Sequence, residues 1–361
     1  TYYGAIGVDI NKDSVKHILE RAEELGKATG VVTSVPLSHS TPAGFVAHNK
    51  KNTYYEAIAR EMILDSATDV IMGCGNPWYN NNGELLTESR SYQYVGGQEV
   101  WDSLVAGIAG GDADADGDND PWVLIQTRTE FQNLATGLTP DRVIGVPLVN
   151  TTLQQRRDGD RNVNPYVIPL TATVPTLEEM TGAALNILDN DPDGLFLVIE
   201  GGAVDWTSHP NQSGRMIEEL IDFNRAVEGV VEWVKHNSNW GETLIIVTGD
   251  HECGYLWGSG SNPTWEPIGN NGRRNLPSMA WYSDDHTNSL IPFFAKGATS
   301  RFFKDYADEY DYLRGHYIDN TEIAKVVFMC LNADSGENIW HRAVSGRLYS
   351  NARHQWGTGW R

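Results

Sequence analysis

Leu195-Phe-Leu-Val-Ile199 is a continuous apolar run, and Leu244-Ile-Ile-Val247 is a second one. Between them, residues 216–234 repeat apolar side chains at the spacing of one helix face. Two short apolar strands on either side of an amphipathic helix are typical of a βαβ unit, in which the strands run parallel. This stretch therefore predicts an α/β fold whose sheet is at least partly parallel.

Outward from this unit, strand and helix patterns continue to alternate along the chain. Thr176-Leu-Glu-Glu179 is a capping box that predicts a helix through Leu188. Residues 76–170 and 255–281 are rich in Gly and Asn and predict loop-rich peripheral insertions. Further strands are predicted at 29–35, 69–72 and 290–294, and further helices at 18–25 with Ser14 as N-cap, from Thr41-Pro42, at 54–64 and at 320–329.

The composition excludes some classes of function. The formal net charge of −21 and the pI of about 4.8 argue against electrostatic binding of nucleic acid, and they suit secretion. No apolar run is long enough to span a membrane. The cysteines number three (Cys74, Cys253 and Cys330) and have no metal-ligand or redox spacing, so a disulfide framework is not expected.

Metal-ligating side chains follow the apolar strands. In an open α/β sheet, ligands bind at the carboxyl ends of the strands, so these side chains should surround one crevice. Asp205 and His209 are four residues apart and share a face on a helical turn. Carboxylate and imidazole together suit zinc. The candidates are His39 and Thr41 after 29–35, then Glu200, Asp205 and His209 after 195–199, Asp250 and His251 after 244–247, and His286 before 290–294.

Simpler explanations exist for each of these patterns taken alone. A single Asp-x-x-x-His is common on protein surfaces, and an Asp-His pair after a strand is often a helix cap. Their joint placement at three strand ends favours a metal site over these alternatives.

At these residues the sequence resembles the alkaline phosphatase family, in order and in spacing. The resemblance implies that family's sandwich, a largely parallel sheet flanked by helices on both faces, as a single domain over residues 1–361. Ser38-His-Ser-Thr-Pro42, Glu200-Gly-Gly-Ala-Val-Asp205 and Thr248-Gly-Asp-His-Glu252 belong to its distinctive motifs. The similar segments are 1–9, 32–48, 69–75, 196–209, 247–252 and 285–297.

The resemblance also implies the ligands of three metal ions. The implied ligands are Asp205, His209 and His286 for a first zinc, Asp250 and His251 for a second zinc, and Thr41 and Glu200 for magnesium, with His39 near this third ion and His48 just outside its ligands.

Two departures from the family pattern concern the nucleophile and the phosphate clamp. The family's nucleophilic serine and a bridging aspartate precede the region that matches Thr1, so we expect an upstream segment to carry both; a processed or degenerate product is the alternative. At the position of a phosphate-binding arginine the sequence reads Asn49-Lys-Lys-Asn52. Lys51 is the candidate there, and a solvated basic turn is the competing interpretation.

The implied function is the hydrolysis of phosphate monoesters through two zincs, one magnesium and a serine phosphoenzyme. The implied protein is a periplasmic or extracellular enzyme that can form a homodimer. A phosphodiesterase, sulfatase or phosphomutase of the same superfamily is one alternative, and a non-catalytic protein that binds metal or phosphate is another.

The run Asp112-Ala-Asp-Ala-Asp-Gly-Asp-Asn-Asp120 resembles the start of a calcium-binding loop, with a glycine at the sixth position. The glutamate expected at the twelfth position is replaced by Val123. A solvated acidic loop is therefore the preferred interpretation, and calcium binding stays open.

Overall fold

A computed structural model describes residues 2–261 and 264–334. The chain divides into two compact units, Thr1–Ala298 and Thr299–Arg361. The single domain expected over residues 1–361 stays a prediction, and residues 335–361 of it lie outside the described part. Among the described helices, none combines the length and apolar character needed to cross a membrane.

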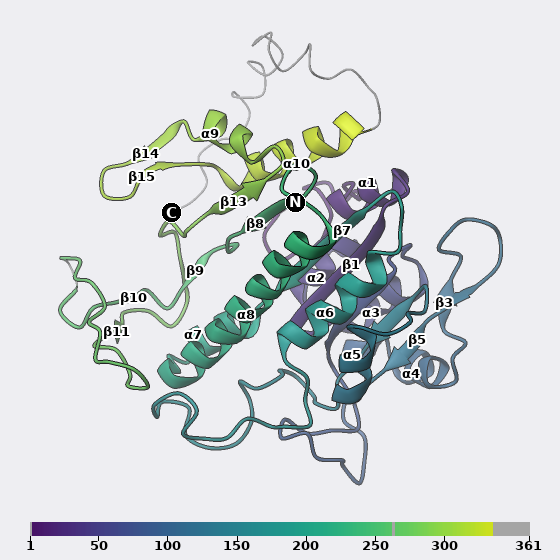
Figure 1. Ribbon diagram of the computed structural model, residues 1–361. Helices are drawn as coiled ribbons and strands as arrows, with labels where there is room; N and C mark the ends of the chain where they lie inside the picture. The colour runs from purple at the N-terminus through teal and green to yellow at the C-terminus, as the bar shows by residue number, and fades with distance from the viewer. Residues whose placement is uncertain (1, 262–263, 335–361) are drawn as a thin grey trace. The chain divides into compact units, whose positions relative to one another are not determined.

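A five-stranded parallel sheet forms the centre of the first unit (Figure 1). Every neighbouring pair in it runs parallel, which confirms the predicted α/β class. The strand order is β5 (Val123–Ile125), β6 (Val143–Gly145), β2 (Val70–Cys74), β1 (Ala28–Pro36) and β7 (Leu195–Glu200).

Helices cover both faces of this sheet because successive strand residues point to opposite sides. Val31 packs into one buried cluster and Val32 into the other, and Ile71 and Met72 divide in the same way. In Figure 1, α6 and α8 lie side by side over one face. One cluster includes residues of α1 (Ile18–Glu24), α2 (Ser40–Val46), α3 (Tyr55–Leu64) and α4 (Gln98–Val105), and the other includes residues of α5 (Arg128–Leu134), α6 (Leu177–Leu188) and α8 (Ser213–Asn237).

A local capping signal explains where α6 begins, whereas the predicted cap of α1 is wrong. The Thr176 hydroxyl accepts the Glu179 amide N–H at 3.1 Å, and the Glu179 carboxylate accepts the Thr176 amide N–H at 2.9 Å, so the predicted capping box forms. The first helix begins at Ile18 as predicted, but its N-cap residue is His17 and not Ser14. Ser14 instead forms a β-bridge with Val8.

The βαβ prediction around residues 195–247 is correct for its elements and wrong for their pairing. β8 (Leu244–Val247) is antiparallel to β13 (Phe294–Gly297) in a separate two-stranded sheet. Within the described residues, β7 is an edge strand paired with β1 alone. The predicted strand at 290–294 is shifted, since its pairing with β8 begins only at Phe294.

The two loop-rich regions differ from each other. Residues 76–170 are not peripheral throughout, because β5 and β6 extend the central sheet on the far side of β2. This region also holds η1 (Gln93–Val95), β3 (Gly110–Gly111) and β4 (Asp120–Pro121). Residues 255–281 form a small antiparallel pair, β10 (Leu256–Trp257) with β11 (Ala280–Trp281), and residues 262–263 there are outside the described part.

The second unit is small. Its described part contains η2 (Ser300–Phe302), α9 (Phe303–Tyr306), the antiparallel pair of β14 (Glu309–Asp311) and β15 (Gly315–Tyr317), and α10 (Asn320–Asp334). The last of these confirms the helix predicted from Asn320.

Helix α8 carries a buried network of charges. The Glu218 carboxylate accepts hydrogen bonds from Arg157 at 2.7 Å and from Arg215 at 3.1 Å. The neighbouring Glu219 is 4% exposed, and its Oε1 atom has no hydrogen-bond partner. Burial, together with the charges of Asp222 and Glu218, raises the pKa of Glu219 to about 8.

The substitution Glu219→Gln should stabilise the protein at alkaline pH. The pKa of Glu219 in the folded state lies above its ordinary value of 4.5. Glu219 therefore contributes its full stabilisation below about pH 4.5, and this contribution is lost as the pH rises through 8. We expect Glu219→Gln to raise the free energy of unfolding by roughly 3 kcal/mol at pH 9 and to change it little at pH 5.

Urea unfolding at both pH values measures this difference. The control is Glu228→Gln, which changes an exposed glutamate on the same helix. Equal pH dependence of the two variants would contradict the assignment to Glu219.

Candidate functional site

Asp205, His209 and His286 converge on one point. Asp205 lies in α7 (Ala203–Ser208), His209 is the C-cap residue of that helix, and His286 begins β12 (His286–Thr287). His286 Nε2 lies 3.4 Å from Asp205 Oδ1 and 3.1 Å from His209 Nε2, and His209 Nε2 lies 3.5 Å from Asp205 Oδ2. The four-residue spacing of Asp205 and His209 places both on one side of the turn, as the sequence indicates.

These three side chains fit a zinc ion. Ligand atoms about 3.3–3.6 Å apart match a tetrahedral ion with ligands at about 2.0–2.2 Å. Asp205 Oδ1 is buried without a hydrogen-bond partner, which is costly for a carboxylate unless a cation binds there. His209 Nδ1 lies 2.8 Å from the Asp284 carbonyl oxygen, and donation to that oxygen leaves Nε2 free to bind a cation.

Cys253 also belongs to this cluster, and the sequence analysis did not identify it. Its Sγ lies within 4.8 Å of ligand atoms of Asp205, His209 and His286. Burial and the nearby Asp205 carboxylate raise the pKa of the Cys253 thiol well above its ordinary value. The only signal in the sequence is its place three residues after Asp250, because cysteine spacing alone does not indicate it.

Asp250 and His251 adjoin the first cluster. His251 Nε2 lies 3.2 Å from Asp250 Oδ2, and the His251 ring stacks on the His286 ring at a centroid distance of 3.5 Å. His251 Nδ1 is buried without a hydrogen-bond partner. The structure thus brings the second predicted pair of ligands next to the first set.

Glu200 and Thr41 form a third group at the carboxyl ends of β7 and β1. The hydroxyls of Thr33 and Thr41 both donate to the Glu200 carboxylate. Burial raises the pKa of Glu200, the two hydroxyls oppose this rise, and the charges of Asp250 and Asp205 add to it. The charges of both aspartates predicted to bind zinc therefore act on the Glu200 carboxylate.

His39 lies close to these carboxylates but binds none of them directly. Its ring packs against Tyr55 at 6.2 Å and against Trp206 at 5.1 Å between centroids. Burial lowers the pKa of His39, whereas the charges of Asp205 and Asp250 oppose this shift. A place for His39 beside the third ion stays a prediction.

Lys51 and His48 lie elsewhere. Lys51 is exposed, and its Nζ lies 5.2 Å from the centre of the Tyr54 ring. His48 contacts Glu61 and the His17 ring, so it does not adjoin the Glu200 group through any contact among the described residues.

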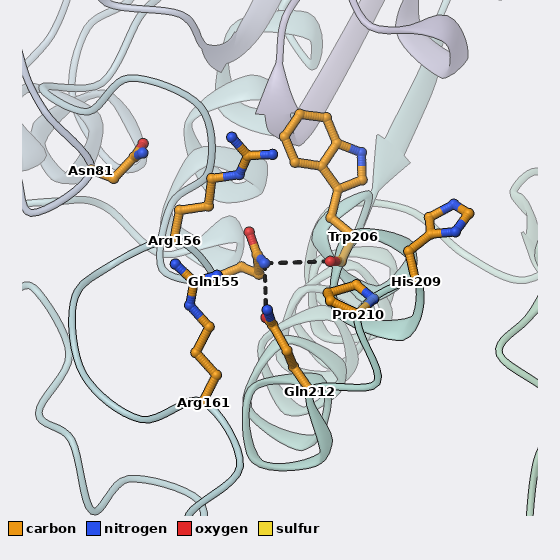
Figure 2. Close-up of a pocket in the computed structure, with 8 residues that line it drawn as sticks. All are labelled: Asn81, Gln155, Arg156, Arg161, Trp206, His209, Pro210 and Gln212. Carbon is orange, nitrogen blue, oxygen red and sulfur yellow. Dashed lines mark hydrogen bonds between the residues drawn. The ribbon is translucent and has the colours of Figure 1, made fainter. Parts of the chain in front are cut away.

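A cavity of about 590 Å³ opens beside the first cluster (Figure 2). Figure 2 shows Arg156 and Arg161 on one side of it and Trp206 and His209 on the other. The Arg156 guanidinium lies 4.9 Å from the Trp206 ring centre. Gln155 Nε2 donates to the Trp206 carbonyl oxygen at 3.3 Å and so anchors this wall.

The two arginines were not predicted as functional residues. Their only sequence signal is a basic cluster, Arg156-Arg-Asp-Gly-Asp-Arg161, in a chain of net charge −21. It falls in a region that was expected to form peripheral loops.

The acidic loop between β3 and β4 is closed by its own backbone. Oxygens of Asp112, Asp114 and Asp120 approach one another, and the Gly117 amide N–H donates to Asp112 at 3.2 Å. A solvated acidic loop stays the preferred interpretation, and calcium binding stays open.

A family model and several curated relatives that match this chain are all alkaline phosphatases. The alkaline phosphatase family model matches residues 1–276. Alkaline phosphatase 4 of Bacillus subtilis is 29% identical over 283 residues, which cover 74% of this chain and 50% of that protein. Alkaline phosphatase of Escherichia coli is 28% identical, over 70% of this chain and 54% of that protein. The chain thus spans about half the length of these curated relatives.

Solved structures show the same fold. The cold-active alkaline phosphatase of Shewanella sp. aligns with a TM-score of 0.64 at 23% identity, over 92% of this chain and 82% of that one. The alkaline phosphatase of the Antarctic bacterium TAB5 aligns with a TM-score of 0.57 at 25% identity, over 83% and 74%. Because the family model covers most of the sequence, this chain belongs to the alkaline phosphatase family.

Proposed function

We propose that the protein containing this chain hydrolyses phosphate monoesters to an alcohol and inorganic phosphate. The observation that supports this most is the meeting of three carboxylates and three histidines beside a cavity with two arginines. Such a site combines ligands for cations with groups that attract phosphate oxygens.

The ligand sets follow the contacts described above. Asp205, His209 and His286 would hold a first zinc, and Asp250 with His251 would contribute to a second. Thr41 and Glu200 would hold magnesium, with His39 beside it. Bound metals of this kind stabilise the negative charge of phosphoryl transfer and lower the pKa of a coordinated oxygen nucleophile. A histidine-to-glutamate variant of the TAB5 enzyme holds magnesium in its M3 site, which is compatible with magnesium here.

The chain's own residues would position the substrate. Arg156 is held against the Trp206 ring, so its guanidinium can present paired N–H donors to phosphate oxygens at the mouth of the cavity. The Asp284 carbonyl fixes the His209 ring, and the Thr33 hydroxyl fixes Glu200. In this proposal the serine that attacks phosphorus comes from a segment outside the 361 residues, and water then releases phosphate from it.

Small phosphate monoesters are the substrates that this proposal favours. A periplasmic or extracellular location and a homodimer belong to the same proposal, since they rest on composition and family resemblance. A phosphodiesterase or sulfatase would use a similar metal site, so a panel of substrates has to separate these activities.

The first test uses the complete natural polypeptide and three chromogenic substrates: a phosphate monoester, a phosphate diester and a sulfate ester. We expect hydrolysis of the monoester to exceed that of the other two by at least about 100-fold in kcat/KM. Preference for the diester or the sulfate would replace the proposed reaction with one of the alternatives.

The substitution Asp205→Asn should remove both metal and activity. We expect kcat/KM for the monoester to fall on the order of 1000-fold, and bound zinc to fall by about one ion per chain, because a charged ligand is lost. Elemental analysis and steady-state kinetics measure the two effects. Asp284→Asn is the matched control, because Asp284 contacts His209 only through its backbone carbonyl among the interactions described.

Arg156 and Lys51 are competing candidates for the phosphate-binding cation. We expect Arg156→Met to raise KM for the monoester about tenfold, or ~1.4 kcal/mol, with a smaller effect from Lys51→Met. The reason is that Arg156 lines the cavity that His209 also lines, whereas Lys51 is exposed beside Tyr54. The reverse order of effects would assign phosphate binding to Lys51.

A further inference from the structure

Three metal-ligating side chains meet in a place that the proposed phosphatase site does not use. His17 is the N-cap residue of α1, Glu20 lies in the first turn of that helix, and His48 follows α2. A β-bridge between Ile6 and Asn49 joins the segments before α1 and after α2. Residues distant in sequence are therefore held together by backbone pairing.

The geometry of the three side chains is close to that of a metal site. The imidazole rings of His17 and His48 stack at a centroid distance of 4.2 Å and an interplanar angle of 10°. Glu20 Oε2 lies 3.8 Å from His17 Nδ1 and 3.9 Å from His48 Nε2. A tetrahedral ion needs ligand atoms about 3.3–3.6 Å apart, so Glu20 would have to move closer to both nitrogens. At least one ring would also have to turn out of the stack, because parallel rings direct their in-plane lone pairs side by side.

His17 is the strongest sign of a missing partner. Its side chain is 7% exposed, and its two ring nitrogens are buried without a hydrogen-bond partner. Buried imidazole nitrogens are normally paired, so this arrangement is costly unless another group binds there. Burial and the neighbouring His48 lower the pKa of His17 to about 4, which leaves a neutral ring at neutral pH.

Gly7 determines how the His17 ring is seated. Its backbone has φ of +55°, and a Cβ atom there would lie 2.3 Å from His17 Nε2. Only glycine therefore leaves room for this ring nitrogen. With Nε2 against the Gly7 backbone, Nδ1 is the atom that faces Glu20.

Glu61 orients the second histidine. Its carboxylate accepts the His48 amide N–H at 2.7 Å and lies 3.3 Å from His48 Nδ1. Donation from Nδ1–H to Glu61 leaves Nε2 directed toward Glu20, as in carboxylate–histidine pairs that support metal sites. The Val15 carbonyl oxygen lies 3.1 Å from the same Nε2 and accepts a hydrogen bond when that nitrogen is protonated, so a metal ion at Nε2 would replace this proton.

We propose that His17 Nδ1, Glu20 and His48 Nε2 bind one divalent transition-metal ion of the zinc class, with water completing its coordination. Two imidazoles and one carboxylate are a donor set that zinc favours. Because its ligands come from both segments, the ion would cross-link the start of α1 and the segment after α2. Its role would be structural. Solvent can reach it past Glu20 and His48, whose side chains are 38% and 16% exposed.

The test is a metal count on the complete protein saturated with zinc and freed of excess metal. Glu20→Gln and His48→Gln each remove one ligand. The amide side chain introduced by Glu20→Gln keeps an oxygen that can accept the His17 amide N–H, now at 2.6 Å from Glu20. The matched control is Glu24→Gln, one turn later on α1, whose carboxylate pairs with Lys16 and Arg21.

We expect Glu20→Gln and His48→Gln to bind about one zinc fewer than the parent and Glu24→Gln, with monoester hydrolysis unchanged in Glu20→Gln. Cobalt substitution should show the same loss as a weaker visible absorption band of the tetrahedral ion. Equal zinc counts and equal cobalt spectra in all four proteins would overturn the proposal and leave a stacked histidine pair that only packs.

Asp205→Asn separates this inference from the proposed function. In that background, a further loss of one zinc on adding Glu20→Gln supports the new site whether or not the protein hydrolyses phosphate esters. Thermal unfolding gives a second readout, because zinc should raise the Tm of Glu24→Gln by several degrees more than that of Glu20→Gln. Equal shifts would contradict a structural ion at this position.

Discussion

The negative charge collected by Glu200, Asp205 and Asp250 is the constraint on which the site depends. Within the described residues, no lysine or arginine is in ion-pair distance of these carboxylates. Histidines lie next to Asp205 and Asp250, and the hydroxyls of Thr33 and Thr41 contact Glu200. Carboxylates that lie partly out of water repel one another unless cations offset their charge. The parallel sheet creates this situation, because β1 and β7 end side by side. Glu200 is the last residue of β7, and Thr41 lies in the first turn of α2, which follows β1.

Local patterns predicted most of the elements, and non-local pairing explains where the prediction failed. The Thr176 capping box and the apolar run at 195–199 are encoded by neighbouring residues, and both formed as predicted. The sequence of β8 does not determine its partner, because its backbone N–H and C=O groups could pair with β7 or with β13. The tertiary structure decides that β8 pairs with β13. Residues 76–170 were assigned to loops because β5 and β6 are only three residues long, too short to produce a period.

The candidate site was predictable to the extent that its residues follow strands directly. Asp250 and His251 do so, whereas Asp205 and His209 follow β7 through the short helix α7. The structure brings these four residues together with His286. No position directly after a predicted strand identifies Cys253, Arg156 or the pair of His17 with His48. These residues reach their neighbours through turns whose geometry depends on the whole fold. Gly7 illustrates this limit: its positive φ makes room for His17, but no spacing rule connects the two residues.

The chain has a negative net charge, whereas two arginines line its cavity, so the two act in opposite directions on an anionic phosphate ester. A net charge of −21 repels an anionic substrate at long range, although salt screens this repulsion beyond about 8–10 Å. Binding therefore depends on positive charge within a short distance of the phosphorus atom. Arg156 and Arg161 at the cavity wall, and cations held by the adjacent carboxylates and histidines, would supply it. If the protein hydrolyses phosphate esters as proposed, its negative net charge would favour compact substrates whose phosphate enters the cavity and would disfavour long polyanions.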